Sequence, residues 1–109
     1  MEGLVRGDVV ILSFPFSDLS AAKVRPALVL ARTQNDVILS QITSREFFDD
    51  YAVSLSRREF VDGCLPTDSW IRLNKLFTAD CSIIARKAGR VAEKKFSEAI
   101  DSLCLFLRS

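Results

Sequence analysis

Short apolar runs rich in β-branched residues recur along the first 90 residues, and polar residues, glycine or proline bound each of them. Runs of this kind are typical of strands. The pattern predicts strands at 8–14, 27–31, 37–43, 51–55, 70–73 and 82–86. The intervening stretch 57–69, with Asp62-Gly63 and Leu65-Pro66, reads as turns. Residues 76–80 read as a turn or short helix, and Gly89 as the end of the last strand.

The period changes near residue 92. Apolar residues then recur at steps of three and four, as they do along one face of an amphipathic helix. This stripe predicts a helix over about 92–107 that packs on the sheet through Phe96, Ala99, Ile100, Leu103, Cys104 and Leu107. Five or more short strands and one closing helix indicate a mainly β, α+β protein: a small curled antiparallel sheet or barrel in one domain spanning 1–109.

The net charge and the absence of histidine limit the kinds of site that the chain can form. The chain has 109 residues, a net charge of +1 and no histidine. The near-zero charge gives no overall field for nucleic acid or membranes, so any such site is local. The absence of histidine removes the commonest general acid or base and the commonest zinc ligand. Any chemistry therefore uses arginine, lysine, carboxylates, hydroxyls or thiols.

The remaining residues give no sign of a metal, a disulfide framework or a membrane anchor. Cys64, Cys81 and Cys104 are odd in number and far apart, which favours ordinary thiols in a cytoplasmic protein. No apolar stretch approaches a membrane span. Four aspartates (Asp49, Asp50, Asp62 and Asp68) lie in turn-like segments without a ligand pattern. We expect no metal, no cofactor and no membrane contact.

One hairpin brings chemically useful residues together. The polar turn at Gln34 and Asn35 makes 27–31 and 37–43 an antiparallel pair. Opposed residue numbers then add to about 68 or 69, which sets Arg25 opposite Thr43 or Ser44. Directly opposed Cβ atoms lie about 4.5–5.5 Å apart, so both side chains reach one phosphate. A one-residue slip would turn one of them to the other face.

Arginine and threonine suit a phosphorane, because a guanidinium fork matches phosphate oxygens and a hydroxyl adds an uncharged donor. The nearby segment 16–23 adds hydroxyls, a cation and an aromatic ring that fit single-stranded RNA: Phe16, Ser17, Ser20 and Lys23. By spacing alone, however, an arginine before a strand is usually a solvated rim residue, and Phe16 is more often packing than a base platform.

A second basic feature lies near the C-terminus, where the run 86–90 contains Arg86, Lys87 and Arg90, and Lys94 and Lys95 begin the predicted helix. Positive charge in a first helical turn opposes the helix dipole, so a partner is conceivable. A solvated face is the favoured interpretation.

Several segments together resemble a known family. They are 6–10 (RGDVV), 14–19 (FPFSDL), 23–30 (KVRPALVL), 42–44 (ITS) and 73–80 (LNKLFTAD), and their order and spacing resemble the MazF/PemK family of type II toxin–antitoxin endoribonucleases over nearly the whole chain. The N-terminal segments are the specific ones. Two departures are Ala21-Ala22 in the 17–23 segment and the acidic Asp49-Asp50 after Thr43.

The resemblance implies an SH3-like barrel of about five to seven short antiparallel strands, a homodimer, and metal-independent cleavage of single-stranded RNA. The catalytic residues would fall on Arg25 and Thr43, with Ser44 and Thr78 joining the RNA-binding set. Attack of the ribose 2′-OH would give a 2′,3′-cyclic phosphate and a 5′-OH. An antitoxin would be the protein partner. Arginine is a poor general base at neutral pH, so the acceptor of the 2′-OH proton stays unassigned.

Two other functions remain open from the sequence. A related toxin, the gyrase inhibitor CcdB, acts on a protein through an aromatic residue near its C-terminus, and this chain ends Leu105-Phe106-Leu107-Arg108-Ser109 within its apolar helical stripe. The same barrel could also be a catalytically inactive module that binds RNA or antitoxin. RNA cleavage separates the endoribonuclease from both.

Overall fold

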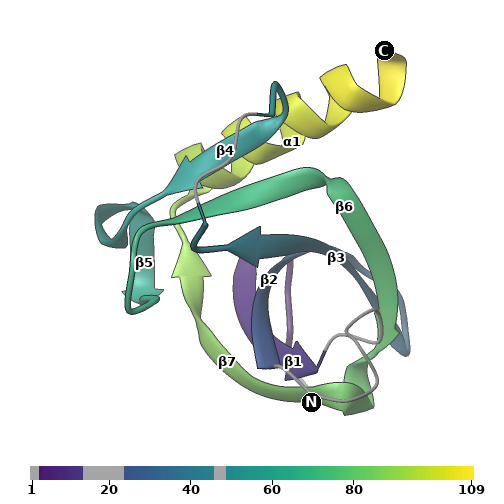
Figure 1. Ribbon diagram of the computed structural model, residues 1–109. Coiled ribbons are helices and arrows are strands. Elements are labelled where there is room, and N and C mark those ends of the chain that lie inside the picture. Colours follow the sequence, from purple (N-terminus) through teal and green to yellow (C-terminus); the bar gives the residue numbers. More distant parts are fainter. Residues whose placement is uncertain (1–2, 14–23, 46–48) are drawn as a thin grey trace.

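The computed structural model describes residues 3–13, 24–45 and 49–109. Within them a seven-stranded antiparallel sheet curls into a half-barrel, and one helix lies beside its upper edge (Figure 1). The strands are β1 (Asp8–Ser13), β2 (Val24–Arg32), β3 (Asp36–Thr43), β4 (Ala52–Leu55), β5 (Phe60–Gly63), β6 (Ser69–Asp80) and β7 (Ile84–Val91). Two 3₁₀ turns, η1 (Arg57–Glu59) and η2 (Cys81–Ile83), and the helix α1 (Glu93–Arg108) complete the fold.

The strands follow the order β4-β6-β3-β2-β1-β7-β5, so β2 lies at the centre of the sheet, between β3 and β1. This arrangement confirms the predicted curled antiparallel sheet with a C-terminal helix. It also confirms the hairpin: Ala27 pairs with Gln41 and Arg32 with Val37, so opposed numbers add to 68 or 69 as expected. The N-terminal strand meets the C-terminal one directly, since Asp8 pairs with Arg90.

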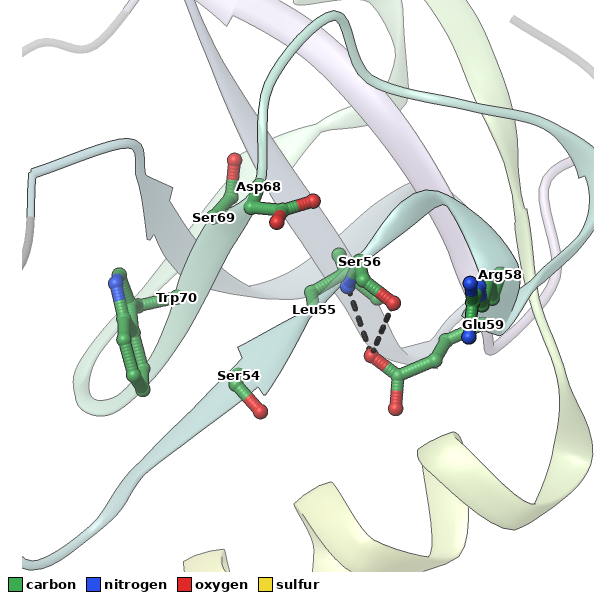
Figure 2. A pocket seen from close by; sticks show the side chains of 8 residues that line it. All are labelled: Ser54, Leu55, Ser56, Arg58, Glu59, Asp68, Ser69 and Trp70. Atoms are coloured by element: carbon green, nitrogen blue, oxygen red, sulfur yellow. Dashed lines mark hydrogen bonds between the residues drawn. The ribbon is translucent and has the colours of Figure 1, made fainter.

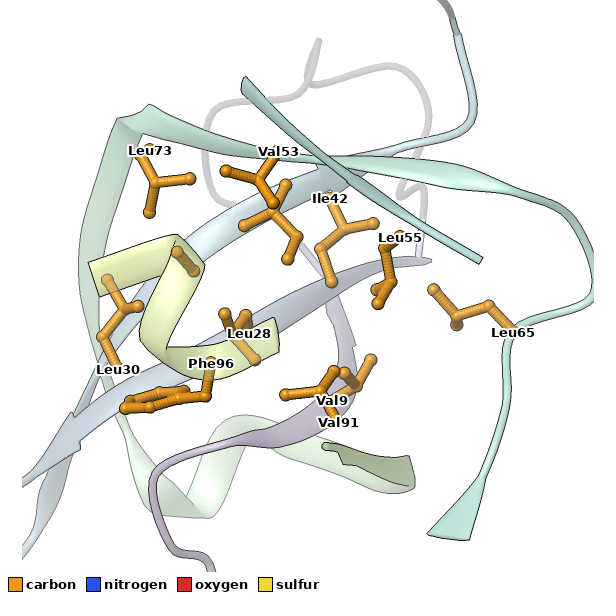
Figure 3. Close-up of a cluster of buried hydrophobic side chains, with 12 residues drawn as sticks. Val9, Leu28, Leu30, Ile42, Val53, Leu55, Leu65, Leu73, Val91 and Phe96 are labelled. Atoms are coloured by element: carbon orange, nitrogen blue, oxygen red, sulfur yellow. The ribbon is translucent and has the colours of Figure 1, made fainter. Parts of the chain in front are cut away.

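Two apolar clusters cover opposite faces of the central strands, because successive side chains of a strand point to opposite sides. Val9, Leu28 and Ile42 belong to the cluster that α1 covers (Figure 3). Their neighbours Val10 and Leu39 belong to the second cluster, on the other face. Near-continuous apolar runs in β1 and β2 are therefore explained by burial on both faces.

The segment 76–80, expected to form a turn or short helix, is the second half of β6. Its residues pair with 36–40 of β3, and this non-local ladder decides the conformation. The pairing shifts between Ser40 and Gln41, whose partners are Leu76 and Arg72, so three residues of β6 bulge out of the ladder. Figure 1 shows β6 turning a corner along its length.

Two further expectations about the C-terminal half are corrected. Residues 60–63, read as part of a turn region, form β5 on the edge of the sheet against β7. The strand expected at 82–86 instead runs from Ile84 to Val91, because Gly89 stays within the ladder, opposite Gly63.

Helix α1 begins and ends within one residue of the prediction, but its apolar stripe is covered only along part of its length. Phe96 and Ala99 are buried, and Ile100 and Leu103 pack against the same cluster. Cys104 is exposed, as is Leu107 at 65%. The expectation that these two residues also pack on the sheet is wrong, since the helix extends beyond the strands it covers.

Candidate functional site

The candidate catalytic residues Arg25 and Thr43 lie at the same end of the β2–β3 hairpin. The ladder between the two strands ends at Ala27 and Gln41, and each candidate stands two residues beyond that pair. Both side chains are half-buried. Arg25 and Thr43 therefore stand at the same end of two neighbouring strands, each two residues past the last pair of the ladder.

Strand alternation also puts Arg25 and Thr43 on one face of the sheet. Arg25 pairs with Leu12 of β1, and Leu12 belongs to the second apolar cluster. Thr43 is four residues along β3 from Leu39, which belongs to the same cluster. This is the face away from α1, and the polar pair stands where the apolar lining of that face ends.

The hydroxyl of Thr43 is oriented by its own chain. The backbone N–H of Arg45 donates to Thr43 Oγ1 at 3.2 Å, in a local turn just after β3. Because a hydroxyl has one donor and two acceptor sites, this contact leaves its O–H able to donate to an anion. Ser44 and Arg45 are both exposed beside it.

A tryptophan and a serine extend the row of residues on this face. Trp70 of β6 pairs directly with Thr43 of β3, and Ser54 of β4 pairs with Trp70. Directly paired residues share a face, and Ile42, Ile71 and Val53, one position along, all lie in the cluster under α1. Trp70 therefore stands next to Thr43 on the face away from the helix. Sequence reasoning missed this neighbour because the β3–β6 register is non-local.

A pocket of about 450 Å³ opens beside Trp70, where β4, η1 and the start of β6 meet (Figure 2). Its other lining residues are mostly polar: Ser54, Leu55, Ser56, Arg58, Glu59, Asp68 and Ser69. In Figure 2, Glu59 accepts from both the backbone N–H and the hydroxyl of Ser56, at 2.7 and 3.2 Å. The wall formed by η1 is thus fixed by hydrogen bonds.

The other RNA-binding candidates are not gathered at this site by the described structure. Phe16, Ser17, Ser20 and Lys23 lie outside the described residues. Thr78 is exposed and pairs with Ile38, five residues along β3 from Thr43. At about 3.3 Å per residue, that is roughly 17 Å along the strand. Thr78 is therefore at the far end of β3 from the candidate catalytic pair.

The C-terminal basic residues do not form one solvated face. Asp8 is fully buried, and its Oδ1 meets Arg90 Nε at 3.0 Å and Lys87 Nζ at 3.1 Å. Its Oδ2 accepts from the backbone N–H of Val5 at 2.9 Å. Lys95 is also buried, so the expectation of solvation is wrong for it, whereas Lys94 is exposed. Sequence reasoning missed Asp8, which looks like an ordinary polar residue at a strand start.

Among the described residues, no three carboxylate, histidine or cysteine side chains gather as a metal site. Within the same part of the chain, no helix is long and apolar enough to cross a membrane. The cysteines differ in exposure: Cys81 is buried, Cys64 half-buried and Cys104 exposed.

The chain thus has a small curled antiparallel sheet, a C-terminal helix, and an arginine and a threonine at one end of a hairpin. The chain belongs to the PemK-like, MazF-like toxins of type II toxin–antitoxin systems, whose family profile matches residues 5–107. No curated protein matches the chain in sequence.

Solved structures of such toxins share the fold. An endoribonuclease in complex with its cognate antitoxin, from a mycobacterial species, superposes with a TM-score of 0.77 at 14% identity, over 97% of this chain and 96% of that one. MazF from Deinococcus radiodurans superposes with a TM-score of 0.76 at 19% identity, over 97% of both chains. The MazE–MazF complex from Deinococcus radiodurans gives 0.75 at 18% identity, over 96% of both chains.

Proposed function

We propose that this protein is an endoribonuclease toxin that cleaves single-stranded RNA without a metal ion. The observation that carries the proposal is the placement of Arg25 and Thr43 on one face, at the shared end of β2 and β3, in a chain that belongs to a toxin family. The solved relatives described as endoribonucleases support the same reaction class.

The reaction uses a nucleophile that the substrate supplies. The ribose 2′-oxygen attacks the adjacent phosphorus, the bond from phosphorus to the 5′-oxygen breaks, and a 2′,3′-cyclic phosphate and a 5′-OH result. The 2′-OH loses its proton to a base, and the leaving oxygen gains one. Arg25 clamps the phosphate, and Thr43 donates to a non-bridging oxygen as charge develops there. The protein mainly orients the reacting atoms and stabilises charge, which suits a chain without histidine.

The test is cleavage of a long single-stranded RNA by the purified protein in EDTA, with the new ends mapped as 5′-OH. Arg25→Ala is expected to lower the rate by about 10²–10³-fold, the usual cost of removing a transition-state donor. Arg108→Ala is the matched control, because Arg108 is an exposed arginine at the end of α1. Equal rates for wild type and Arg25→Ala would remove Arg25 from the mechanism.

We further propose that the protein acts in the cytoplasm as a homodimer and is neutralised by a cognate antitoxin. The relatives solved as toxin–antitoxin complexes support the antitoxin partner. Light scattering after gel filtration measures the oligomeric state, and a monomer at micromolar concentration contradicts the homodimer. Capture of gyrase together with absence of RNA cleavage would instead favour a CcdB-like toxin, and RNA binding without turnover an inactive module.

A further inference from the structure

Trp70 occupies a position that a nucleic-acid site can use. It is the neighbour of Thr43 across the β3–β6 ladder, so the Cβ atoms of the two residues are about 4.5–5.5 Å apart. Its side chain is half-buried and lines the pocket in Figure 2. Among the described residues, its ring makes no stacking contact with another aromatic ring, unlike Tyr51, which packs on Phe106.

The chemistry of the pocket favours a nucleobase over a phosphate. Two carboxylates, Glu59 and Asp68, and one guanidinium, Arg58, line it. Glu59 is already paired with Lys95, whereas Asp68 and Arg58 are exposed residues of the lining. A phosphate next to these carboxylates is repelled, whereas the amide and amino edges of a base find hydroxyl, carboxylate and guanidinium partners.

We propose that Trp70 is the stacking platform for a base that flanks the scissile phosphate, and that the pocket beside it receives the edge of that base. The inference rests on the proposed function, because Thr43 marks the position of the phosphate. Stacking on a tryptophan is sequence-tolerant and strong. Trp70 thus holds the strand so that the phosphate lies between Arg25 and Thr43.

The first experiment uses the tryptophan itself as the reporter, since Trp70 is the only one in the chain. The Arg25→Ala protein, which is expected to cleave RNA only slowly, is titrated with single-stranded RNA of mixed sequence while tryptophan fluorescence is recorded. We expect quenching with single-stranded RNA and little change with a DNA duplex, whose bases are not free to stack. Unchanged fluorescence while the RNA binds by filter retention would overturn the inference.

The second experiment separates stacking from packing by comparing Trp70→Leu and Trp70→Phe. Leucine keeps an apolar side chain at this position and removes the aromatic face, while phenylalanine restores a ring. Trp70→Leu should lower kcat/KM for RNA cleavage about 5–150-fold, chiefly through KM, and Trp70→Phe should retain most of the wild-type value. Melting temperatures of both variants close to wild type ensure that the loss reflects binding.

These outcomes distinguish a failure of the proposed stacking role of Trp70 from a failure of the proposed endoribonuclease function. Arg25-dependent cleavage with an unaffected Trp70→Leu variant would overturn the stacking role and leave the endoribonuclease standing. Quenching by RNA in a wild-type protein that never cleaves RNA would overturn the endoribonuclease function and leave the contact between Trp70 and RNA standing. Fluorescence that depends on protein concentration and not on RNA would place Trp70 at an interface between copies and overturn the inference.

Discussion

The Nζ atom of Lys95 in α1 lies 2.6 Å from Oε2 of Glu59 in η1, and the lysine side chain is only 6% exposed. Burial alone would lower the pKa of Lys95, but the contacts with Glu59 and Glu98 outweigh it and hold the pKa above 10.5. Burial would likewise raise the pKa of Glu59, yet the hydrogen bonds from Lys95 and Ser56 hold it below 4.5. The pair ties the helix to the wall of the pocket.

This pair predicts a pH-dependent loss of stability. Because the pKa of Glu59 is lowered on folding, its contribution is present above its ordinary pKa of 4.5 and is lost as the pH falls through the folded-state value. Glu59→Gln should cost about 1.5–3 kcal/mol at neutral pH, and the difference from wild type should shrink below about pH 4.5. Urea denaturation across the pH range measures it.

The control is Glu98→Gln, which removes the more exposed partner of Lys95 and should cost less than about 1 kcal/mol. The raised pKa of Lys95 adds no change near neutrality, since its contribution is complete below pH 10.5 and is lost only as the pH rises through the folded-state value. A gap between wild type and Glu59→Gln that stays constant down to pH 3 contradicts the assignment.

The buried Asp8 makes a second prediction. Asparagine at this position still accepts from Val5 but loses the charge that faces Arg90 and Lys87. Asp8→Asn should lower the free energy of unfolding by about 1.5–3 kcal/mol. Lys87→Met should cost less, because Arg90 remains to satisfy the carboxylate. If both variants unfold at the same denaturant concentration as wild type, the buried charge is not stabilising.

Gly63 is expected to be the least replaceable glycine near the sheet edge. Its φ is +61°, and a Cβ atom there would clash with the backbone carbonyl oxygen of Ala88. Gly63→Ala should therefore cost about 2–4 kcal/mol through the left-handed backbone and the clash together. Gly3→Ala is the matched control: φ is +78° and nothing lies within 4 Å, so only about 1–2 kcal/mol of backbone strain applies. Thermal denaturation of the two variants compares them, and equal losses count against the clash.

The candidate catalytic threonine, Thr43, and the candidate RNA-binding threonine, Thr78, should respond very differently to loss of the hydroxyl. Thr43→Val keeps the shape and removes the hydroxyl, so RNA cleavage should fall about 10²–10³-fold, while Thr43→Ser should retain most activity. Thr78→Val should change the rate little, because Thr78 lies at the far end of β3. Initial rates on one RNA substrate decide between them, and a greater loss at Thr78 would move the site along the strand.

The sequence predicted the elements whose structure depends on neighbouring residues, namely the β2–β3 hairpin and helix α1. The turn at Gln34 and Asn35 was enough to predict the β2–β3 register, because a short hairpin has few alternatives. The helix was predictable for the same reason, since its period lies within its own sequence. The second half of β6 was not, because residues 76–80 are strand only through pairing with a partner about forty residues away.

The candidate site likewise contains residues that the sequence could bring together and residues that meet only through non-local pairing. Arg25 and Thr43 belong to neighbouring strands, whereas Trp70 reaches Thr43 through the β3–β6 ladder and Ser54 reaches Trp70 through β4–β6. Lys95 likewise looked like a helix-surface cation, because its partner Glu59 lies in a separate 3₁₀ turn. Burial of a charge by a distant partner leaves no trace in either segment alone.

The pairing of β1 with β7 affects the order in which the parts of the sheet fold. The ladder cannot close until Arg90, the partner of Asp8, has been synthesised, and the two residues are 82 positions apart. Contacts of such sequence separation slow folding, because a long loop must close before they form. We therefore expect the β1–β7 ladder to close late in folding, after the β2–β3 hairpin, whose strands are joined by a short turn.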